Sequence, residues 1–167
     1  MRIFLDANIL FSAAKSDGAV RRFVEMALDA GHECVVDAYV LEEARRNLVA
    51  KAPGSVDFLE SLLRRLRNVP LVAGSPVFET DVPLPADDRP VLASAIQNWC
   101  DALLTGDRTH FGPLYGKTID GVAIHSPRSL AEALGLAPTG SRDALYAPEA
   151  PYKVRRIRVR AARRNDK

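Results

Sequence analysis

Short, continuously apolar runs separated by segments of helical periodicity are the feature that most constrains how this chain can fold. Five such runs lie at residues 3–5, 34–36, 70–73, 102–104 and 121–124. Runs this short and this apolar suit strands that are buried on both faces of a sheet. Because the strands alternate with helices, we expect an α/β fold with a mostly parallel, roughly five-stranded sheet that helices cover on both faces.

Apolar residues recur at helical spacing between these runs, and polar residues mark where the helices begin. Asp37 and Ser55 are predicted N-caps, while Pro90 fits a first helical turn, where no backbone donor is needed. The predicted helical segments are 9–14, 20–28, 40–48, 58–66, 91–96 and 126–134, the last beginning at Ser126-Pro127.

The composition is that of a globular protein. With 167 residues, 47% hydrophobic and 26% charged, the chain can bury an ordinary core as one domain. No apolar stretch approaches the ~20 residues that span a membrane, so we expect no transmembrane helix, and the opening residues lead us to expect no signal peptide. Cys34 and Cys100 lie among apolar neighbours. We therefore expect reduced, buried thiols in a cytoplasmic protein without a membrane partner.

The net charge of +2 conceals a basic C-terminal tail. Residues 153–167 hold eight Lys or Arg and one Asp, which leaves the rest of the chain at −5. Pro138, Gly140, Pro148 and Pro151 argue against regular structure before this tail. We expect residues 136–167 to be a Pro- and Gly-containing basic extension, flexible or partner-binding.

Acidic residues stand where the apolar runs end. Asp6 follows the first run and Asp107 the fourth, so in a parallel sheet both would emerge at the carboxyl edge. Asp88 begins the helix before the fourth run, and Glu42 and Glu43 lie in the helix after the second. Hard divalent cations such as Mg²⁺ and Mn²⁺ require oxygen ligands of this kind.

Each acid also has a simpler explanation when it is taken alone. Asp6, Asp87 or Asp88 would serve as helix N-caps, Asp107 as a turn residue after Gly106, and Glu43 as part of a solvated helix face. Their joint placement favours the metal site, because independent caps have no reason to gather at one sheet edge.

Four segments carry a resemblance to a known family. They are Ile3-Phe4-Leu5-Asp6-Ala7-Asn8, Val40-Leu41-Glu42-Glu43-Ala44-Arg45-Arg46, Asp88-Arg89-Pro90-Val91-Leu92-Ala93-Ser94-Ala95 and Asp101-Ala102-Leu103-Leu104-Thr105-Gly106-Asp107. Their order and spacing resemble the PIN-domain ribonucleases, which include the VapC toxins of bacterial toxin–antitoxin pairs. The resemblance implies a three-layer α/β/α nuclease domain over residues 1–135, with an acidic Mg²⁺ or Mn²⁺ pocket that hydrolyses RNA.

The resemblance assigns the four catalytic and metal-binding carboxylates of the family to Asp6, Glu43, Asp88 and Asp107. A shift of one residue would instead select Glu42 in place of Glu43, or Asp87 in place of Asp88. Asn8 and Thr105 resemble supporting residues of the pocket. Ala7 departs from the family, where a hydroxyl is frequent at this position, and Asp101 precedes its strand at the opposite edge, which favours a structural role.

The resemblance implies a metal-dependent endoribonuclease, as the toxin of a type II toxin–antitoxin pair. Its partners would be RNA and an antitoxin protein, with a second copy of the chain as a further candidate. Arg89, Arg108 and Lys117 are the candidate RNA-binding residues near the acidic edge. The alternatives are a non-catalytic RNA- or protein-binding module, a housekeeping RNA-processing nuclease, and a nuclease acting on DNA.

Overall fold

The computed structural model describes residues 1–71, 78 and 81–136, and its centre is a six-stranded sheet. The strand order is β3-β2-β1-β4-β6-β5, and every neighbouring pair is parallel except the β5–β6 hairpin. The strands are β1 Arg2–Leu5, β2 Glu33–Asp37, β3 Arg67–Val69, β4 Ala102–Leu104, β5 Thr118–Ile119 and β6 Val122–His125. The predicted α/β fold class with its mostly parallel sheet is confirmed.

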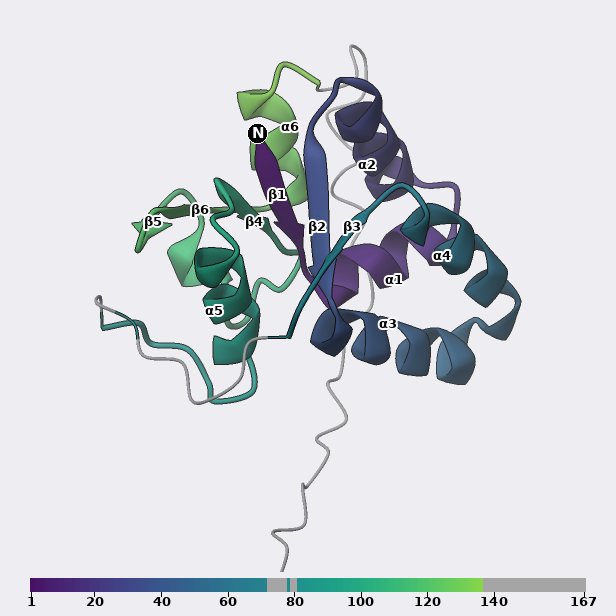
Figure 1. The fold of residues 1–167 in the computed structure, drawn as a ribbon, viewed down its shortest axis with the longest axis horizontal. Helices are drawn as coiled ribbons and strands as arrows, with labels where there is room; N and C mark the ends of the chain where they lie inside the picture. Colours follow the sequence, from purple (N-terminus) through teal and green to yellow (C-terminus); the bar gives the residue numbers. More distant parts are fainter. Residues whose placement is uncertain (72–77, 79–80, 137–167) are drawn as a thin grey trace, which may run out of the picture.

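Helices flank this sheet (Figure 1). The helix α1 contacts α2, α3 and α4, whereas α5 contacts β4, and α6 contacts β6 and α2. The α-helices are α1 Ala7–Lys15, α2 Ala19–Asp29, α3 Ala38–Lys51, α4 Val56–Leu63, α5 Arg89–Gln97 and α6 Pro127–Ala133; two 3-10 turns are η1 Pro53–Ser55 and η2 Gly112–Leu114.

Two edge strands differ from the sequence prediction. The third strand, expected at residues 70–73, lies at Arg67–Val69. Pro70 cannot donate a backbone hydrogen bond to a neighbouring strand, and residues 72 and 73 lie outside the described part of the chain. The two-residue strand β5 was not predicted, so the sheet has six strands rather than about five.

The predicted helix starts were partly right. The Asp37 carboxylate accepts a hydrogen bond from Val40 N (3.0 Å), which confirms it as the N-cap of α3, and Pro90 lies in the first turn of α5. Ser55 occupies the N-cap position of α4, but its side chain caps nothing among the described residues. Instead its hydroxyl donates to the Lys15 carbonyl at 3.5 Å.

The central strands form the most deeply buried part of the core. Phe4, Leu5, Leu103 and Ile124 are almost wholly inaccessible to solvent. Full burial of a side chain of this size contributes about 1.5–3 kcal/mol. Because β1 and β4 are held so firmly, the residues that follow them at the carboxyl edge start from a rigid base.

Both cysteines lie in this described core and both are free thiols. Burial raises the pKa of Cys34 to about 12 and that of Cys100 to about 11, so both are protonated at neutral pH. Within the described residues, no helix has the length and apolar character that crossing a membrane requires. The basic extension predicted at 136–167 falls, apart from Leu136, outside the described residues.

Candidate metal centre

Asp6 lies at the junction of the two central strands and the first helix. Its backbone N–H donates to the Leu104 carbonyl (3.0 Å), which extends the β1–β4 pairing by one step. Its side-chain Oδ1 accepts a hydrogen bond from Ala7 N (2.6 Å) and so caps α1. The helix therefore begins at Ala7, two residues before the predicted start. The residue is only 6% exposed.

The other carboxylate oxygen of Asp6 is held by residues from two strand ends. Thr105 Oγ1 and Asn8 Nδ2 each donate to Asp6 Oδ2 at 2.6 Å. The Asn8 side chain also accepts a hydrogen bond from Gly106 N (2.7 Å), which ties the start of α1 to the segment after β4. A Cβ atom at Gly106 would lie 3.1 Å from Asn8 Oδ1, so this close approach favours glycine. The network fixes the orientation of the Asp6 carboxylate.

The environment of Asp6 opposes its negative charge. The pKa of Asp6 is raised to about 7 as the net result of several contributions, of which burial is the largest. The nearby charges of Glu43 and Asp88 also raise it, while the hydrogen bonds from Thr105 and Ala7 N lower it. A carboxylate that is desolvated and faces other acids is stabilised when a cation is bound beside it.

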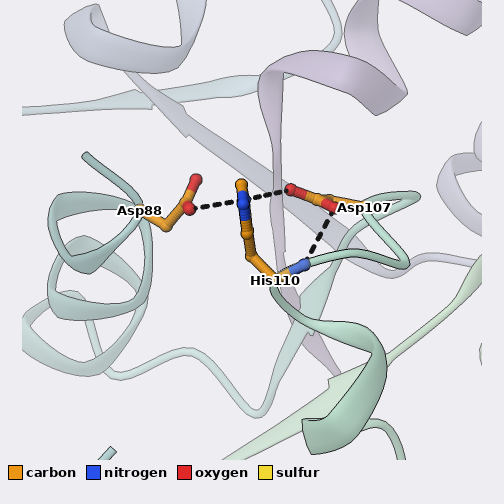
Figure 2. A group of neighbouring side chains, drawn as sticks. All are labelled: Asp88, Asp107 and His110. Carbon is orange, nitrogen blue, oxygen red and sulfur yellow. Dashed lines mark hydrogen bonds and ion pairs between the residues drawn. The ribbon is translucent and has the colours of Figure 1, made fainter. Parts of the chain in front are cut away.

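A second group of side chains lies around His110 (Figure 2). His110 Nδ1 is 2.8 Å from an oxygen of Asp88 and 3.0 Å from an oxygen of Asp107. The Asp107 carboxylate accepts hydrogen bonds from Thr109 N (2.8 Å) and His110 N (3.1 Å), a turn that holds the acid and the imidazole together. One ligand atom from each of the three side chains lies within 4.8 Å of the others, so this group could hold a metal ion.

Asp88 occupies the N-cap position of α5 without acting as a cap. In the described first turn of that helix no backbone N–H donates to its side chain, which is directed at His110 instead (Figure 2). Burial raises the pKa of Asp88, His110 opposes this, and Asp107, Glu43 and Asp87 add to it. Asp87 is exposed, and its carbonyl accepts a hydrogen bond from the Tyr39 hydroxyl (2.9 Å). The geometry therefore favours Asp88 over Asp87 as the acid of the cluster.

Glu43 faces the same cluster from α3. It is half-buried, whereas Glu42 is exposed. The charge of Glu43 raises the pKa values of Asp6, Asp88 and Tyr39, while the charge of Glu42 acts on Arg45. One face of α3 thus places Glu43 near the acids and turns Glu42 away from them.

The four acids also lie within a single match to a known family. The family model of the PIN domain matches residues 2–109, a range that contains Asp6, Glu43, Asp88 and Asp107. The chain belongs to the PIN domain family. Membership implies, in general terms, a nuclease that hydrolyses phosphodiester bonds.

Solved structures resemble this PIN domain in fold. VapBC2 from Rickettsia felis, bound to a DNA fragment from its promoter, matches 75% of this chain and 98% of its own, with 16% identity and a TM-score of 0.57. FitAcB from Neisseria gonorrhoeae gives the same coverages, 18% identity and a TM-score of 0.49. No curated protein shows significant sequence similarity to the chain. At this identity the VapBC2 structure supports the fold alone.

The three predicted RNA-binding residues lie in different settings around the PIN domain. The Arg89 guanidinium donates to the carbonyls of Leu84 (3.2 Å) and Val82 (3.1 Å), which favours a structural role. Arg108 is exposed beside Asp107. Lys117 is exposed next to β5, and its carbonyl accepts a hydrogen bond from Ile124 N (2.9 Å). RNA binding by these residues stays a prediction.

Asp101 lies at the amino end of β4, away from the acidic cluster. Its carboxylate accepts a hydrogen bond from Arg2 N (2.6 Å), and its own N–H donates to the Arg2 carbonyl (2.8 Å). Together these bonds tie β4 to the start of β1, in agreement with the structural role predicted for this acid.

Sequence reasoning missed two residues of the centre, His110 and Tyr39. His110 is one of three histidines in the chain and follows Asp107 by three residues, a spacing that a turn brings together. Tyr39 lies in the first turn of α3, and its hydroxyl donates to the Asp87 carbonyl in the segment before α5. Burial and the nearby acids raise the pKa of Tyr39 to about 12, so its hydroxyl stays a donor at neutral pH.

Proposed function

We propose that this PIN domain is a metal-dependent endoribonuclease that uses Mg²⁺ or Mn²⁺ bound by Asp6, Glu43, Asp88 and Asp107. The observation that carries the proposal is that Glu43 and Asp88 act electrostatically on the buried carboxylate of Asp6, whose pKa is raised to about 7, and that Asp107 lies beside Asp88 at His110. Hard divalent ions prefer oxygen ligands. Because burial and neighbouring acids destabilise the ionised carboxylate of Asp6, binding of a divalent cation beside it would be favourable. The residues present therefore fit the metal that the family generally uses.

The chain's own residues prepare this site in a defined way. Thr105 and Asn8 hold Asp6 Oδ2 in one orientation, and the turn after Asp107 holds that acid beside Asp88. When bound, a divalent ion activates water as the nucleophile and neutralises the charge that gathers on the phosphate. Side chains already fixed in place need no reorganisation as the phosphodiester reacts.

Exposed cations around the acidic edge are suited to hold the RNA backbone. Arg108 follows Asp107 directly, and Arg46, which was not predicted, lies close enough to Tyr39 to lower the pKa of its hydroxyl. The sequence of residues 153–167 contains a further eight Lys or Arg and only one Asp. Phosphate contacts made by such residues give binding that weakens as salt rises.

A nuclease assay with paired variants tests this proposal. Fluorescent single-stranded RNA is incubated with the full chain in Mn²⁺, in Mg²⁺ and in EDTA, and cleavage is expected only with a divalent ion. Glu43→Gln should lower kcat/KM by about a hundredfold or more, while the matched Glu42→Gln should stay within about twofold, because only Glu43 faces the cluster. Equal loss in both variants, or cleavage that persists in EDTA, would refute the assignment.

We infer further that the nuclease is the toxin of a type II toxin–antitoxin pair that acts in the cytoplasm. The support is the fold shared with VapBC2, crystallised with a promoter fragment. Expression of the chain should arrest growth of a bacterial host, and Asp6→Asn should not. Co-expression of the small reading frame beside its gene should restore growth. Growth unaffected by an active nuclease would instead favour a housekeeping RNA-processing enzyme, and lack of cleavage a binding module.

The division into a nuclease domain, residues 1–135, and a basic extension, residues 136–167, is part of the same proposal. If the extension contacts RNA, deletion of residues 153–167 should reduce the slope of log affinity against log salt by about 0.7 for each phosphate that the extension neutralises. An unchanged slope would assign the extension to another partner, such as the antitoxin or a second copy of the chain.

A further inference from the structure

We propose that His110 is a nitrogen ligand of the ion bound by Asp88 and Asp107, so that this centre is mixed in oxygen and nitrogen and favours first-row transition ions such as Mn²⁺ over Mg²⁺. The inference rests on the proposed function, whose ligands are carboxylates, and adds to it a residue that determines metal specificity.

The separations between the donor atoms match those of neighbouring ligands on one ion. Two adjacent ligands of an octahedral ion with bonds of about 2.0–2.1 Å lie about 2.9 Å apart. His110 Nδ1 is 2.8 Å from Asp88 Oδ2 and 3.0 Å from Asp107 Oδ2. The distance from the nitrogen to each carboxylate oxygen is therefore the distance expected between two adjacent ligands of one ion.

The His110 nitrogen is directed into the cluster without a completed hydrogen bond. Nδ1 is shielded from solvent and lies at ion-pair distance from both carboxylates (Figure 2), although neither contact has hydrogen-bond geometry and the His110 side chain as a whole is 36% exposed. When Nδ1 carries no proton, its lone pair and the two carboxylates are three acceptors around one point, which repel one another. A cation between Nδ1 and the two carboxylates would remove this repulsion.

The backbone around His110 holds the imidazole in this position. His110 N donates to Asp107 Oδ1 (3.1 Å), and the next residue, Phe111, is wholly buried in the core. The turn η2 follows immediately at Gly112. With an anchor on each side of His110, the ring is placed at the centre by the fold and not by a mobile loop end.

The chemical consequence concerns which ion the centre selects. Mg²⁺ takes oxygen ligands almost exclusively, whereas an imidazole nitrogen adds affinity for first-row transition ions. A purely acidic centre would discriminate little between Mg²⁺ and Mn²⁺. With His110 as a ligand, Mn²⁺ gains a bond that Mg²⁺ gains weakly.

Pulsed electron paramagnetic resonance with Mn²⁺ as the probe tests the ligand directly. The full chain is labelled with ¹⁵N only at histidine, and the wild type should show a ¹⁵N coupling to Mn²⁺. The coupling should vanish in His110→Asn and in His110→Ala and persist in His32→Asn, a control whose ring lies beside the N-terminus. Circular dichroism establishes that each variant is folded.

Calorimetric titration of the same proteins tests the specificity. His110→Ala should weaken Mn²⁺ binding by about tenfold or more and Mg²⁺ binding by less than about threefold. If Mn²⁺ binds and RNA is cleaved, but no histidine coupling appears or both ions weaken equally, His110 is not a ligand and the nuclease assignment stands. If neither ion binds, the metal-dependent function fails and the inference fails with it.

Discussion

Replacing Asp6 with asparagine removes one buried negative charge while keeping the size of the side chain. The pKa of Asp6 is raised from 3.8 to about 7, chiefly by burial. The folded protein therefore holds this proton more tightly than the unfolded chain does. In the absence of metal, the stabilisation from the protonated carboxyl is complete below about pH 4 and is lost as pH rises through about 7.

The loss of unfolding free energy can be calculated from the difference between the ordinary pKa of Asp6, 3.8, and its raised value of about 7. One pH unit of full slope corresponds to about 1.4 kcal/mol, so metal-free wild-type protein should lose about 2–3 kcal/mol of unfolding free energy between pH 5 and pH 8 through Asp6. The asparagine variant has no proton to lose at this position. The gap between wild type and Asp6→Asn should therefore shrink by that amount over the same range.

The substitution also carries a cost that does not depend on pH. Thr105 and Asn8 both donate to Asp6 Oδ2, and the amide nitrogen of asparagine cannot accept from them. A buried group left without its partner costs about 1–3 kcal/mol. This cost lowers the unfolding free energy of the variant by the same amount at every pH. Only the pH dependence of the difference in unfolding free energy between wild type and variant therefore reports on the Asp6 proton.

Urea unfolding in EDTA at pH 5, 6, 7 and 8 measures both quantities for the two proteins. Other titrating groups act in both proteins and largely cancel in the difference. Addition of Mn²⁺ at pH 8 should stabilise the wild type by mass action and the variant much less. Stability curves that run parallel for wild type and Asp6→Asn from pH 5 to pH 8 would refute the reasoning that burial holds a proton on Asp6.

Three further substitutions have expected outcomes. Thr105→Val removes a donor that lowers the Asp6 pKa, so stability should fall by about 1–2 kcal/mol and the pH profile of metal-dependent cleavage should move to higher pH. Gly106→Ala places a Cβ 3.1 Å from Asn8 Oδ1, so the melting temperature and cleavage should both decrease. Trp99 is 87% exposed at φ 54°, so Trp99→Gly should raise unfolding free energy by up to about 1 kcal/mol in a urea titration.

The sequence predicted the strands that are buried on both faces and missed those at the edges. β4 is apolar throughout and β1 is apolar from Ile3 to Leu5, because these residues are buried on both faces of the sheet, and each apolar run can be recognised in the sequence. In β3, Arg67 and Asn68 are exposed, so pairing with β2 leaves no apolar signature. Edge strands are defined by backbone hydrogen bonds, which residue type records only weakly.

The acids of the candidate centre were predicted to the extent that strand ends fix them. The shared location of Asp6 and Asp107 could be predicted because each comes shortly after a strand, β1 or β4, of a parallel sheet. The choice between Glu42 and Glu43 depended on the rotation of α3, which a single sequence leaves open by one residue. His110 was missed because its place depends on the turn after Asp107 and on the buried anchor Phe111.

Helix capping and metal binding are compatible roles for one carboxylate. Asp6 caps α1 through Oδ1 alone and presents Oδ2 to Thr105 and Asn8, and an ionised carboxylate has about four acceptor positions. Asp88 shows the converse, because it occupies an N-cap position while its side chain is directed at His110. An acid at the N-cap position after a parallel strand can therefore still be a metal ligand. Whether it can bind the metal depends on where the carboxylate oxygen that does not cap the helix lies.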